Sequence, residues 1–535
     1  MLTRAAERLL WLLPLAFFAL FFAYPVLNLL VTALHPDGHW ELAVFGQVFS
    51  DSRFWSVLWF TVWLAAASTV LTLLVALPGA WVLARFRFWG KGLIEALAVV
   101  AFVMPTVVVA AAVSSSTERL GVPGLSEGVP AILLAHLYLN VGVVLRLVGN
   151  YWSQLDPQVE EAAAALGAPP WRRFLNVTWP RLAPAVLASS AIVFLFTFTS
   201  FGVVLILGRI GQANLEVLIY RKVVQLFNLP EGAVLAIVQI ILVAVLLVVQ
   251  SWLSRRLETR QGLLALPRLQ RPRTAGQRSI VAAFLVCSLA LLAGPIVAVF
   301  LDAFGGSQGW SLTNYAALGT SNEGTILFVS PIEAVRNSLV FAVAATVIAL
   351  IIGSVVAFVL SGRASPLTES IWLLPLGVSA VTLGFGLLIT FDEPPVNFRG
   401  SAALIPIAQA LVAIPFVTRA VLPTLRSVRG NIREAAATLG ATPLQTWRFV
   451  DLPMIVRGLA VAAGFAMAIS LGEFGATVFL ARSEFPTIPI AIYRFLGSPG
   501  DINYGQAMAL SSILIVVTAL VVVGTDRLRT SARYL

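Results

Sequence analysis

The sequence predicts an all-α protein that crosses a membrane about twelve times, built as two parallel repeats of six helices. Apolar residues make up 59% of the 535 residues and charged residues only 11%, whereas an ordinary soluble domain carries about 25% charge. The apolar residues form runs that mostly reach the roughly 20 residues a helix needs to cross a hydrocarbon core. A polar segment between two of these runs also recurs further along the chain.

Helices are the expected form of the apolar runs, because backbone polar groups inside lipid must find partners within the protein. Arg4 and Arg8 precede the first run as in a signal peptide, but the run is too long for one and no convincing cleavage site follows, so we expect it to remain as the first span. The expected spans of the first half are 9–34, 57–84, 93–115, 129–149, 182–208 and 233–253. Those of the second half are 279–303, 338–361, 370–391, 402–422, 455–481 and 507–524.

The two halves form an internal duplication. Residues 135–221 align without a gap with residues 408–494, at the constant offset of 273 that separates position 161 from position 434. Because six helices is an even number, both copies have the same orientation and form parallel repeats. The basic, proline-containing segment 254–279 separates them. We therefore expect a first domain at 1–253 and a second at 280–535, joined by a cytoplasmic linker.

The distribution of charge predicts the orientation. With the N-terminus inside, most of the 35 Lys and Arg residues fall in cytoplasmic segments, as the positive-inside rule requires. Both termini are then cytoplasmic. The net charge of +10 is spread over short loops and forms no single basic face, which argues against nucleic-acid binding.

The repeated polar segment lies at 153–181 and again at 426–454. Each copy contains Glu-Ala-Ala, a glycine after three further residues, and then a hydrophobic residue and a proline at identical spacing. Asp156 is placed to cap a helix that Gly167 ends, and a second short helix is expected from Pro170, or from Thr442 and Pro443 in the second copy. The residues of interest are Glu161, Ala162, Ala163, Gly167 and Pro180, and Glu434, Ala435, Ala436, Gly440 and Pro453.

These two segments resemble the cytoplasmic coupling loop of bacterial ABC importer permeases. The small departures from the usual pattern are Val177 and Val450 in place of Ile, and Trp179 in place of Leu. The resemblance implies a type I-like permease fold in the bacterial inner membrane, with each loop docked into an ATP-binding cassette subunit. It also implies two copies of that subunit, one per loop, and an extracytoplasmic substrate-binding protein as a further partner.

The chain contains no GxxxxGK[ST] phosphate-binding loop. We therefore expect ATP to be bound and hydrolysed by the partner subunit, and the permease itself to be neither an enzyme nor the carrier of a cofactor. The alternative class is a secondary transporter driven by an ion gradient. That class would be expected to place charged residues deep within several spans.

Local motifs suggest the substrate. Segments 199–204 and 215–220, with 470–475 and 486–489, resemble the thiamine and ferric-iron importer permeases, and residues 233–257 resemble the thiamine members more closely. We therefore favour thiamine or a related cationic nutrient and keep iron(III) as the alternative.

Three polar residues within or near the spans are candidates for the substrate pathway. Glu473 lies in the expected eleventh span, where a carboxylate usually faces a cavity or a partner. A purely structural role, in which it pairs with Arg482 or water and braces the helix, is the competing interpretation. Ser200 is its repeat mate, and His136 lies in the fourth span.

We expect no metal site. His35 and His39 share one short loop with poor convergence of ligands, and Cys287 is the only cysteine.

Overall fold

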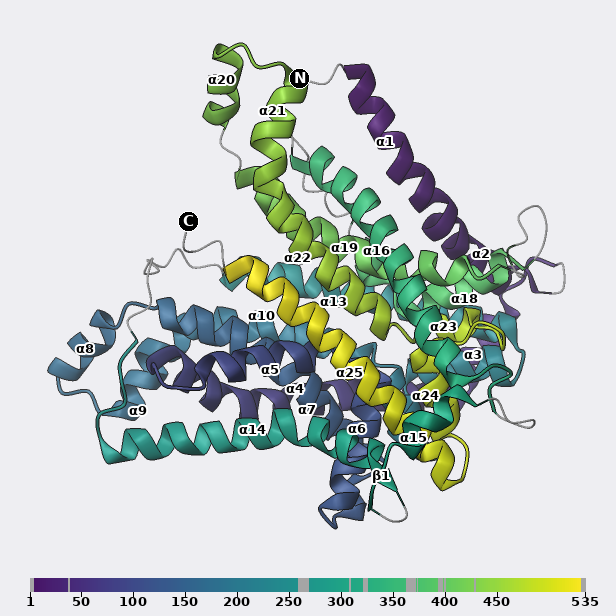
Figure 1. The fold of residues 1–535 in the computed structure, drawn as a ribbon, viewed down its shortest axis with the longest axis horizontal. Coiled ribbons are helices and arrows are strands. Elements are labelled where there is room, and N and C mark those ends of the chain that lie inside the picture. The colour runs from purple at the N-terminus through teal and green to yellow at the C-terminus, as the bar shows by residue number, and fades with distance from the viewer. Residues whose placement is uncertain are drawn as a thin grey trace.

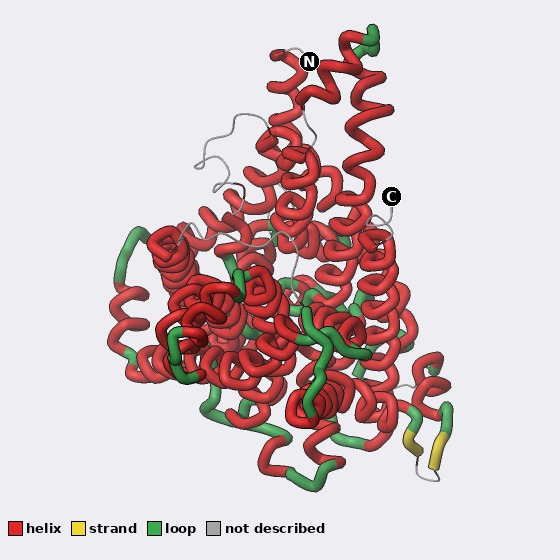
Figure 2. The backbone as a smooth tube through the Cα atoms, turned by 90° about the vertical axis from the view of Figure 1, so that its left-hand side faces the viewer, coloured by secondary structure: helices red, strands yellow, loops and turns green. Residues whose placement is uncertain are grey.

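The computed structural model describes residues 4–36, 39–257, 269–306, 309–320, 326–361, 372, 374–392, 398, 401–427 and 430–530. Part of the predicted linker, residues 258–268, and the beginning of the predicted ninth span, residues 370, 371 and 373, lie outside the described residues. Helices account for almost all of the described chain, and one short hairpin supplies its strands (Figure 2).

The first half contains thirteen α-helices and several short π and 3-10 segments. The helices are α1 (Arg4–Phe18), α2 (Tyr24–Leu34), α3 (Ala43–Ser50), α4 (Ser52–Arg85), α5 (Lys91–Val103), α6 (Thr106–Arg119), α7 (Val129–Gln154), α8 (Gln158–Ala165), α9 (Pro170–Arg173), α10 (Trp179–Phe198), α11 (Gly202–Leu207), α12 (Leu215–Tyr220) and α13 (Leu229–Leu257). The π segments are η1 (Ala19–Ala23), η4 (Phe174–Thr178) and η5 (Arg221–Gln225), and η3 (Pro123–Leu125) is a 3-10 turn.

The second half follows a similar order, but it begins with one long helix, α14, and a small hairpin in which Gly305 pairs with Trp310 and Gly306 with Gly309. Its helices are α14 (Ala275–Ala303), α15 (Thr313–Ala316), α16 (Pro331–Ser361), α18 (Ala380–Thr390), α19 (Leu404–Ser427), α20 (Gly430–Thr438), α21 (Pro443–Thr446), α22 (Leu452–Gly472), α23 (Thr477–Leu480), α24 (Ile488–Leu496) and α25 (Asp501–Thr530). The remaining elements are β1 (Gly305–Gly306), β2 (Gly309–Trp310), the 3-10 turns η6 (Ala317–Gly319) and η7 (Leu374–Gly377), and the π segment η8 (Trp447–Asp451).

The all-α, polytopic class is confirmed. Among the described residues, nine helices are long and apolar enough to cross a membrane, and the bent pair α5 and α6 can supply a tenth span. Two shorter apolar helices, Ala380–Thr390 and Gly458–Gly472, occupy the positions of the expected ninth and eleventh spans.

Three expected spans are not continuous helices, and here the prediction was wrong. The span predicted at 93–115 bends by 114° between α5 and α6, because Pro105 lacks a backbone donor and forces Met104 into an extended conformation. The spans predicted at 182–208 and 455–481 each end early, at Phe198 and Gly472, and resume as the short helices α11 and α23.

The first helices of each half pack on the other half. In the first half α1 contacts α16 and α2 contacts α18, whereas in the second half the single long helix α14 contacts α4 and α6. Two of these leading helices also pack on the last helix of their own half, α2 on α13 and α14 on α25. This reciprocal exchange is the contact pattern of a pseudo-twofold axis, and it interlocks the halves along their length (Figure 1).

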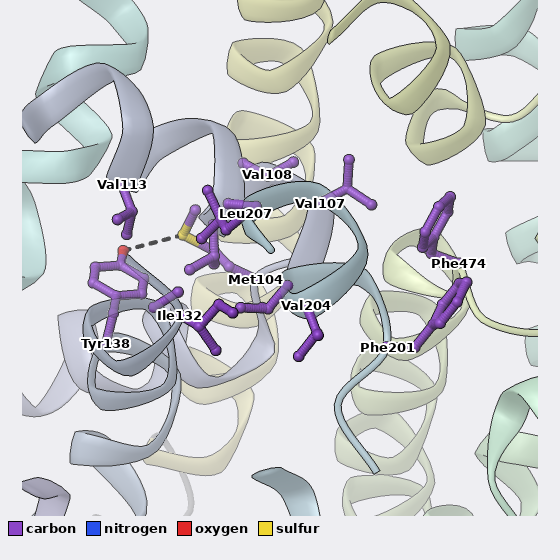
Figure 3. Packing of buried hydrophobic residues seen from close by; sticks show 14 of the residues in the cluster. Met104, Val107, Val108, Val113, Ile132, Tyr138, Phe201, Val204, Leu207 and Phe474 are labelled. Atoms are coloured by element: carbon purple, nitrogen blue, oxygen red, sulfur yellow. Dashed lines mark hydrogen bonds between the residues drawn. The ribbon is translucent and has the colours of Figure 1, made fainter. Parts of the chain in front are cut away.

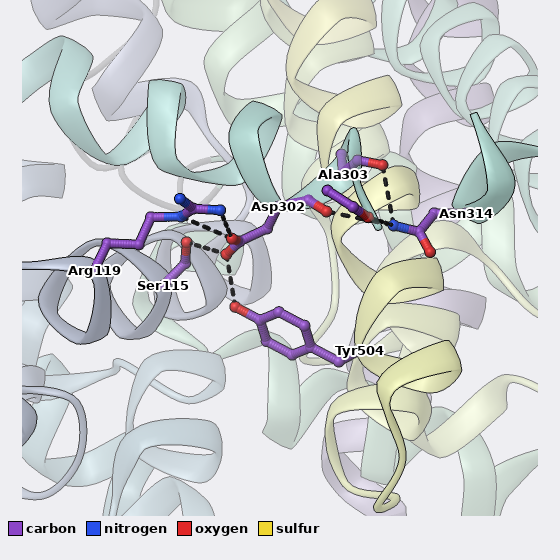
Figure 4. A network of polar contacts seen from close by, with 7 residues as sticks. Ser115, Arg119, Asp302, Ala303, Asn314 and Tyr504 are labelled. Carbon is purple, nitrogen blue, oxygen red and sulfur yellow. Dashed lines mark hydrogen bonds and ion pairs between the residues drawn. The ribbon is translucent and has the colours of Figure 1, made fainter. Parts of the chain in front are cut away.

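A polar network fastens the halves at one end (Figure 4). Asp302, near the end of α14, accepts hydrogen bonds from Arg119 Nε at 2.7 Å and from the hydroxyl of Tyr504 at 2.8 Å, and it also accepts from Ser115. Arg119 and Ser115 belong to α6 of the first half and Tyr504 to α25. Charge-assisted hydrogen bonds of this kind are stronger than neutral ones, so one carboxylate ties three helices from both halves.

Candidate functional site

The two repeated polar segments adopt the same structure. We call residues 156–181 the first elbow and residues 430–454 the second elbow. In the first, α8 leads through Gly167 into α9 and η4, and in the second, α20 leads through Gly440 into α21 and η8. The elements correspond in order at the offset of 273, so the structure gives the sequence repeat the same form in both halves.

A glycine in the left-handed region ends the first helix of each elbow. Gly167 has φ +80° and Gly440 has φ +81°. In the first elbow the N–H of Gly167 donates to the carbonyl of Ala164 and that of Ala168 to Ala163, each at 3.0 Å. The second elbow repeats both bonds with the same lengths, from Gly440 to Ala437 and from Ala441 to Ala436. This is the Schellman arrangement, and it confirms the glycine stops.

The expected Thr442 cap is present, whereas the expected Asp156 cap is displaced, because the N-cap residue of α8 is Pro157, one residue later. The Asp156 carboxylate accepts from the backbone N–H of Gln158 at 3.0 Å. Thr442 and Gln445 exchange hydrogen bonds at the start of α21: the Gln445 N–H donates to the Thr442 hydroxyl at 3.3 Å and the Thr442 N–H to the Gln445 side chain at 2.8 Å. In the first elbow Pro170 begins α9, as predicted.

Pro180 and Pro453 explain a feature that the sequence analysis missed. Each follows a five-residue π segment, η4 or η8, through which the elbow joins a long helix. A proline removes one backbone donor and its ring clashes with the carbonyl four residues before it. Widening the preceding turn to π geometry relieves that clash.

The tips of the elbows are apolar and exposed. Leu166 is 88% exposed and its repeat mate Leu439 is 89% exposed. Glu161 and Glu434 are exposed beside them, as are the first alanines, Ala162 and Ala435. In Figure 1, α8 projects from the body of the molecule at the left and α20 at the top, where α1 also begins. A large exposed side chain on a small-residue helix, present twice, has the character of a contact surface.

The first elbow is anchored to its own half through Glu160. The Glu160 carboxylate forms an ion pair with Arg85, at the end of α4, and accepts from the Thr178 hydroxyl at 3.2 Å. Arg181 donates to the backbone carbonyl of Asp156 at 3.2 Å. The internal anchor therefore uses the neighbour of Glu161 and leaves Glu161 on the exposed face.

A single helix connects each elbow with a break near the centre of the molecule. α10 runs from the first elbow to Phe198, and α22 runs from the second elbow to Gly472. The breaks after them contain the two predicted pathway residues Ser200 and Glu473, which are repeat mates.

The backbone groups freed at these breaks are satisfied by side chains. Glu473 accepts from the N–H groups of Ala476 at 2.8 Å and Thr477 at 3.0 Å, and also from the Thr477 hydroxyl. At the first break the amide of Asn214 donates to the Ser200 carbonyl at 2.6 Å. These bonds give Glu473 a bracing role, since irregular backbone at membrane depth must be satisfied inside the protein.

His136 is buried and bridges two hydroxyls. Its Nδ1 lies 2.8 Å from the Ser68 hydroxyl and its Nε2 lies 2.9 Å from the Ser200 hydroxyl. His136, on α7, thus contacts Ser200 at the first break and Ser68 on α4. The structure therefore brings two of the predicted pathway residues together. Both ring nitrogens of His136 therefore have hydrogen-bond partners inside the protein.

Stacked aromatic rings close the interface between the breaks (Figure 3). Phe201 and Phe474, which are repeat mates, lie with ring centroids 5.4 Å apart and planes 23° apart. Tyr220 packs on Phe201 and its mate Tyr493 packs on Phe474, each at 5.4 Å. Both phenylalanines are buried, so the stacked pair fills the interface between the two breaks; we call it the aromatic barrier.

A cavity of about 550 Å³ lies beside this aromatic barrier. The sequence analysis did not predict a cavity. The full lining is Tyr220, Val223, Val224, Phe227, Leu229, Leu388, Ile389, Asp392, Val478, Phe479, Ala481, Ile490, Tyr493 and Arg494. It therefore combines residues of both halves.

Glu216 is a second feature that the sequence analysis missed. Its buried carboxylate accepts from the Gln239 amide at 2.6 Å and from the Ser379 hydroxyl at 3.0 Å. Ser379 caps α18 of the second half, so Glu216 links the halves. The signal available in the sequence was a lone acidic residue in the apolar stretch 215–220.

These features define a class of protein: a duplicated, membrane-spanning helical permease whose halves meet at a closed aromatic barrier and each carry one projecting elbow. Residues 76–262 match the family model described as "Binding-protein-dependent transport system inner membrane component". Together with a relative that is 34% identical to it, this match places the chain in the family, and the chain is a multi-pass membrane protein.

Relatives with similar sequences support the assignment. The chain is 26% identical over 507 residues to the thiamine transport system permease protein ThiP of Salmonella typhimurium, covering 90% of each chain. It is 25% identical over 475 residues to ThiP of Escherichia coli, covering 84% of this chain and 85% of that one. It is also 34% identical over 199 residues to the molybdenum transport system permease protein ModB of Mycobacterium bovis, covering 34% of this chain and 74% of ModB.

Proposed function

We propose that the chain is the permease subunit of an ATP-binding cassette importer that carries thiamine, or a closely related cationic nutrient, into the cell. The observation that carries the coupling part of the proposal is the pair of elbows, identical in backbone geometry and exposed at their tips. The substrate part rests on the thiamine permeases that match 84–90% of the chain.

The partner proposed for the elbows is an ATPase, one copy for each elbow. Leu166 or Leu439 enters a cleft of the partner, and the adjoining alanines let its backbone approach. Glu161 and Glu434 add a charge for pairing with a basic side chain. ATP stays on that partner, where its binding and hydrolysis supply the movement.

Movement of an elbow is transmitted by a rigid element. α10 and α22 each lead from an elbow to a central break, so displacing an elbow displaces the stack of Phe201 on Phe474. In this scheme the aromatic barrier opens when the two elbows move relative to each other, and the transported molecule passes along the interface between the halves.

The proposed orientation follows from the same surfaces. The elbows and both termini face the cytoplasm, as the distribution of Lys and Arg indicates. The surface of the molecule remote from the elbows then faces the binding protein. The domains proposed from the repeat, 1–253 and 280–535, place one elbow in each.

The coupling proposal is tested by the double variant Glu161→Lys and Glu434→Lys. We expect the ATPase that co-purifies with the wild-type chain to be lost, because both exposed carboxylates are reversed in charge. Glu333→Lys is the matched control, since Glu333 pairs with its exposed neighbour Arg336 and lies outside the elbows. Retention of the partner by the double variant, or uptake by vesicles of the lone chain driven by an ion gradient, would refute the proposal.

The substrate proposal is tested by uptake of radiolabelled thiamine into cells that express the chain with its partners. We expect saturable uptake that excess thiamine competes away and ferric iron does not. Uptake of radiolabelled ferric iron by the same cells, with no accumulation of thiamine, would assign the chain to the iron(III) alternative instead.

A further inference from the structure

The cavity beside the aromatic barrier lies at the end of the molecule remote from the elbows. α10 runs away from the first elbow, and α13 begins at Leu229, next to the cavity, and returns toward the linker. A helix of this length spans roughly 40 Å at 1.5 Å per residue. In Figure 1, α18, α23 and α24, which also line the cavity, lie on the side away from α8 and α20.

Several aromatic side chains line this cavity. Tyr220, Phe479 and Tyr493 are contributed by both halves, and Tyr220 meets Phe479 edge to face at 5.8 Å. Two of these rings carry hydroxyl groups that can hydrogen-bond to a ligand. Rings of this kind attract cations that lie over their faces.

Two charged side chains complete the lining. Asp392, just after α18, contributes a carboxylate, and Arg494, on α24, contributes a guanidinium. The carboxylate favours a positively charged ligand, while the guanidinium requires hydrogen-bond acceptors on the same ligand. A planar heteroaromatic cation with ring nitrogens or hydroxyls satisfies both.

Phe227 at the rim holds an unusual backbone conformation. Its φ is +53°, and among the described residues it is the one non-glycine with positive φ. The position 273 residues later is Gly500, with φ +122°. The second repeat thus uses glycine where the turn demands positive φ, whereas the first repeat keeps a phenylalanine whose side chain is 81% exposed. Strained residues of this kind cluster at ligand-binding sites.

The turn that holds Phe227 is fixed by its neighbours. The Asn228 N–H donates to the Lys222 carbonyl at 2.8 Å, and the Asn228 side-chain amide donates to Glu231 at 2.8 Å. Glu231 also forms an ion pair with Lys222. The exposed ring is therefore held at the cavity mouth by a polar network.

We propose that this cavity binds the transported molecule before it crosses the aromatic barrier, that it accepts a planar heteroaromatic cation, and that Phe227 is a specificity-determining wall at its mouth. The inference rests on the proposed function for the identity of the probe, thiamine. The inference adds a binding site inside the permease, whereas the proposed function requires only that the transported molecule pass between the halves.

The test measures thiamine binding to the purified full-length chain in nanodiscs, without partner proteins, by isothermal titration calorimetry. We expect saturable binding that Phe227→Gly weakens about three- to thirtyfold, through loss of one ring–cation contact. The same substitution should leave the melting temperature unchanged or raised, because glycine adopts positive φ without strain. Leu226→Gly is the matched control: Leu226 is also exposed but does not line the cavity, and its affinity should equal that of the wild type.

A second variant tests the charge. Asp392→Asn should weaken binding of thiamine more than binding of its uncharged aminopyrimidine fragment. Equal affinity of the wild type and Phe227→Gly, or absence of saturable binding by a chain whose complete transporter takes up thiamine, would overturn the cavity site and leave the proposed function standing. Saturable, Phe227-dependent binding in a chain whose complete transporter does not accumulate thiamine would overturn the function and leave the site.

Discussion

Glu473 has a structural role that its position in the sequence did not reveal. A carboxylate in an apolar segment suggests a pathway residue. The structure places its oxygens on the N–H groups of Ala476 and Thr477, where they replace the acceptors that an unbroken helix would have supplied. At the break of its repeat mate, Ser200, the Asn214 amide instead donates to a backbone carbonyl, that of Ser200. The two halves thus use different side chains to satisfy different backbone groups at corresponding breaks.

We expect Glu473→Ala to lower the melting temperature of the purified chain, because it leaves two buried N–H groups without acceptors at about 1–3 kcal/mol each. Glu473→Gln, which keeps one acceptor oxygen, should lower it less. The measurement is thermal unfolding in detergent, alongside thiamine uptake. Normal stability of both variants with abolished uptake would instead assign Glu473 to the pathway.

His136 illustrates what the sequence can and cannot give at this scale. Its position in the fourth apolar span marked it as a polar residue inside the bundle. Its partners, Ser68 and Ser200, lie 68 and 64 residues away. No local pattern connects such positions, so only the packing of α4 and α7 with the first break identifies the bridge.

At the scale of elements, the elbows were the most predictable part of the molecule. Their caps and glycine stops depend on residues within a few positions of one another, and such signals are visible in sequence. The spacing of Asp156, Gly167 and Pro170 located both short helices of the first elbow. The corresponding residues of the second repeat located both short helices of the second elbow.

The shape of the elbows depends on the two glycines, and this can be tested. An added Cβ at Gly167 or Gly440 meets nothing within 4 Å, so an alanine is disfavoured only by positive φ, at about 1 kcal/mol each. We expect Gly167→Ala with Gly440→Ala to reduce thiamine-stimulated ATP hydrolysis by the complete transporter severalfold, with little change in melting temperature.

Gly276→Ala is the control for that experiment. Gly276 is also exposed with free space around it, but it lies within α14 and has no positive φ. Its substitution should leave ATP hydrolysis unchanged. Full stimulation in the double variant would show that the elbow geometry is not needed for coupling.

The broken spans were the elements that the sequence predicted wrongly. Hydropathy continues across Ser200 and Glu473, so the runs 182–208 and 455–481 look like single helices. The chain after the first break packs tightly on distant residues: a Cβ at Gly202 would lie 2.4 Å from Thr106 and 3.2 Å from Phe474. The spacing of apolar residues along one segment does not show which distant residues that segment will contact.

At the scale of the whole molecule, the halves are interlocked and not merely adjacent. The leading helices of each half, α1 and α2 or α14, pack on the other half, and Asp302 ties α14 to α6. Each half alone would expose these faces. We therefore expect each half to be stable only when it is packed against the other half.

This arrangement predicts the behaviour of a split chain. Residues 1–253 and 280–535, expressed together as two polypeptides, should assemble, so that an affinity tag on one retains the other after membrane extraction. Expressed singly, each should aggregate or be degraded, because its exchanged surfaces are unpaired. Stable, monodisperse halves purified separately would contradict the interlocked design.

The sequence by itself determined the environment, the duplication, the approximate spans and the two elbows, because hydropathy, repeat spacing and helix capping act over short distances along the chain. Only the tertiary structure decided where spans break, which residues pair at the pseudo-twofold axis, and that a cavity with Phe227 at its mouth lies beside the barrier. These features come from contacts between residues hundreds of positions apart, such as Phe201 with Phe474, whose partners are fixed only when the halves pack together.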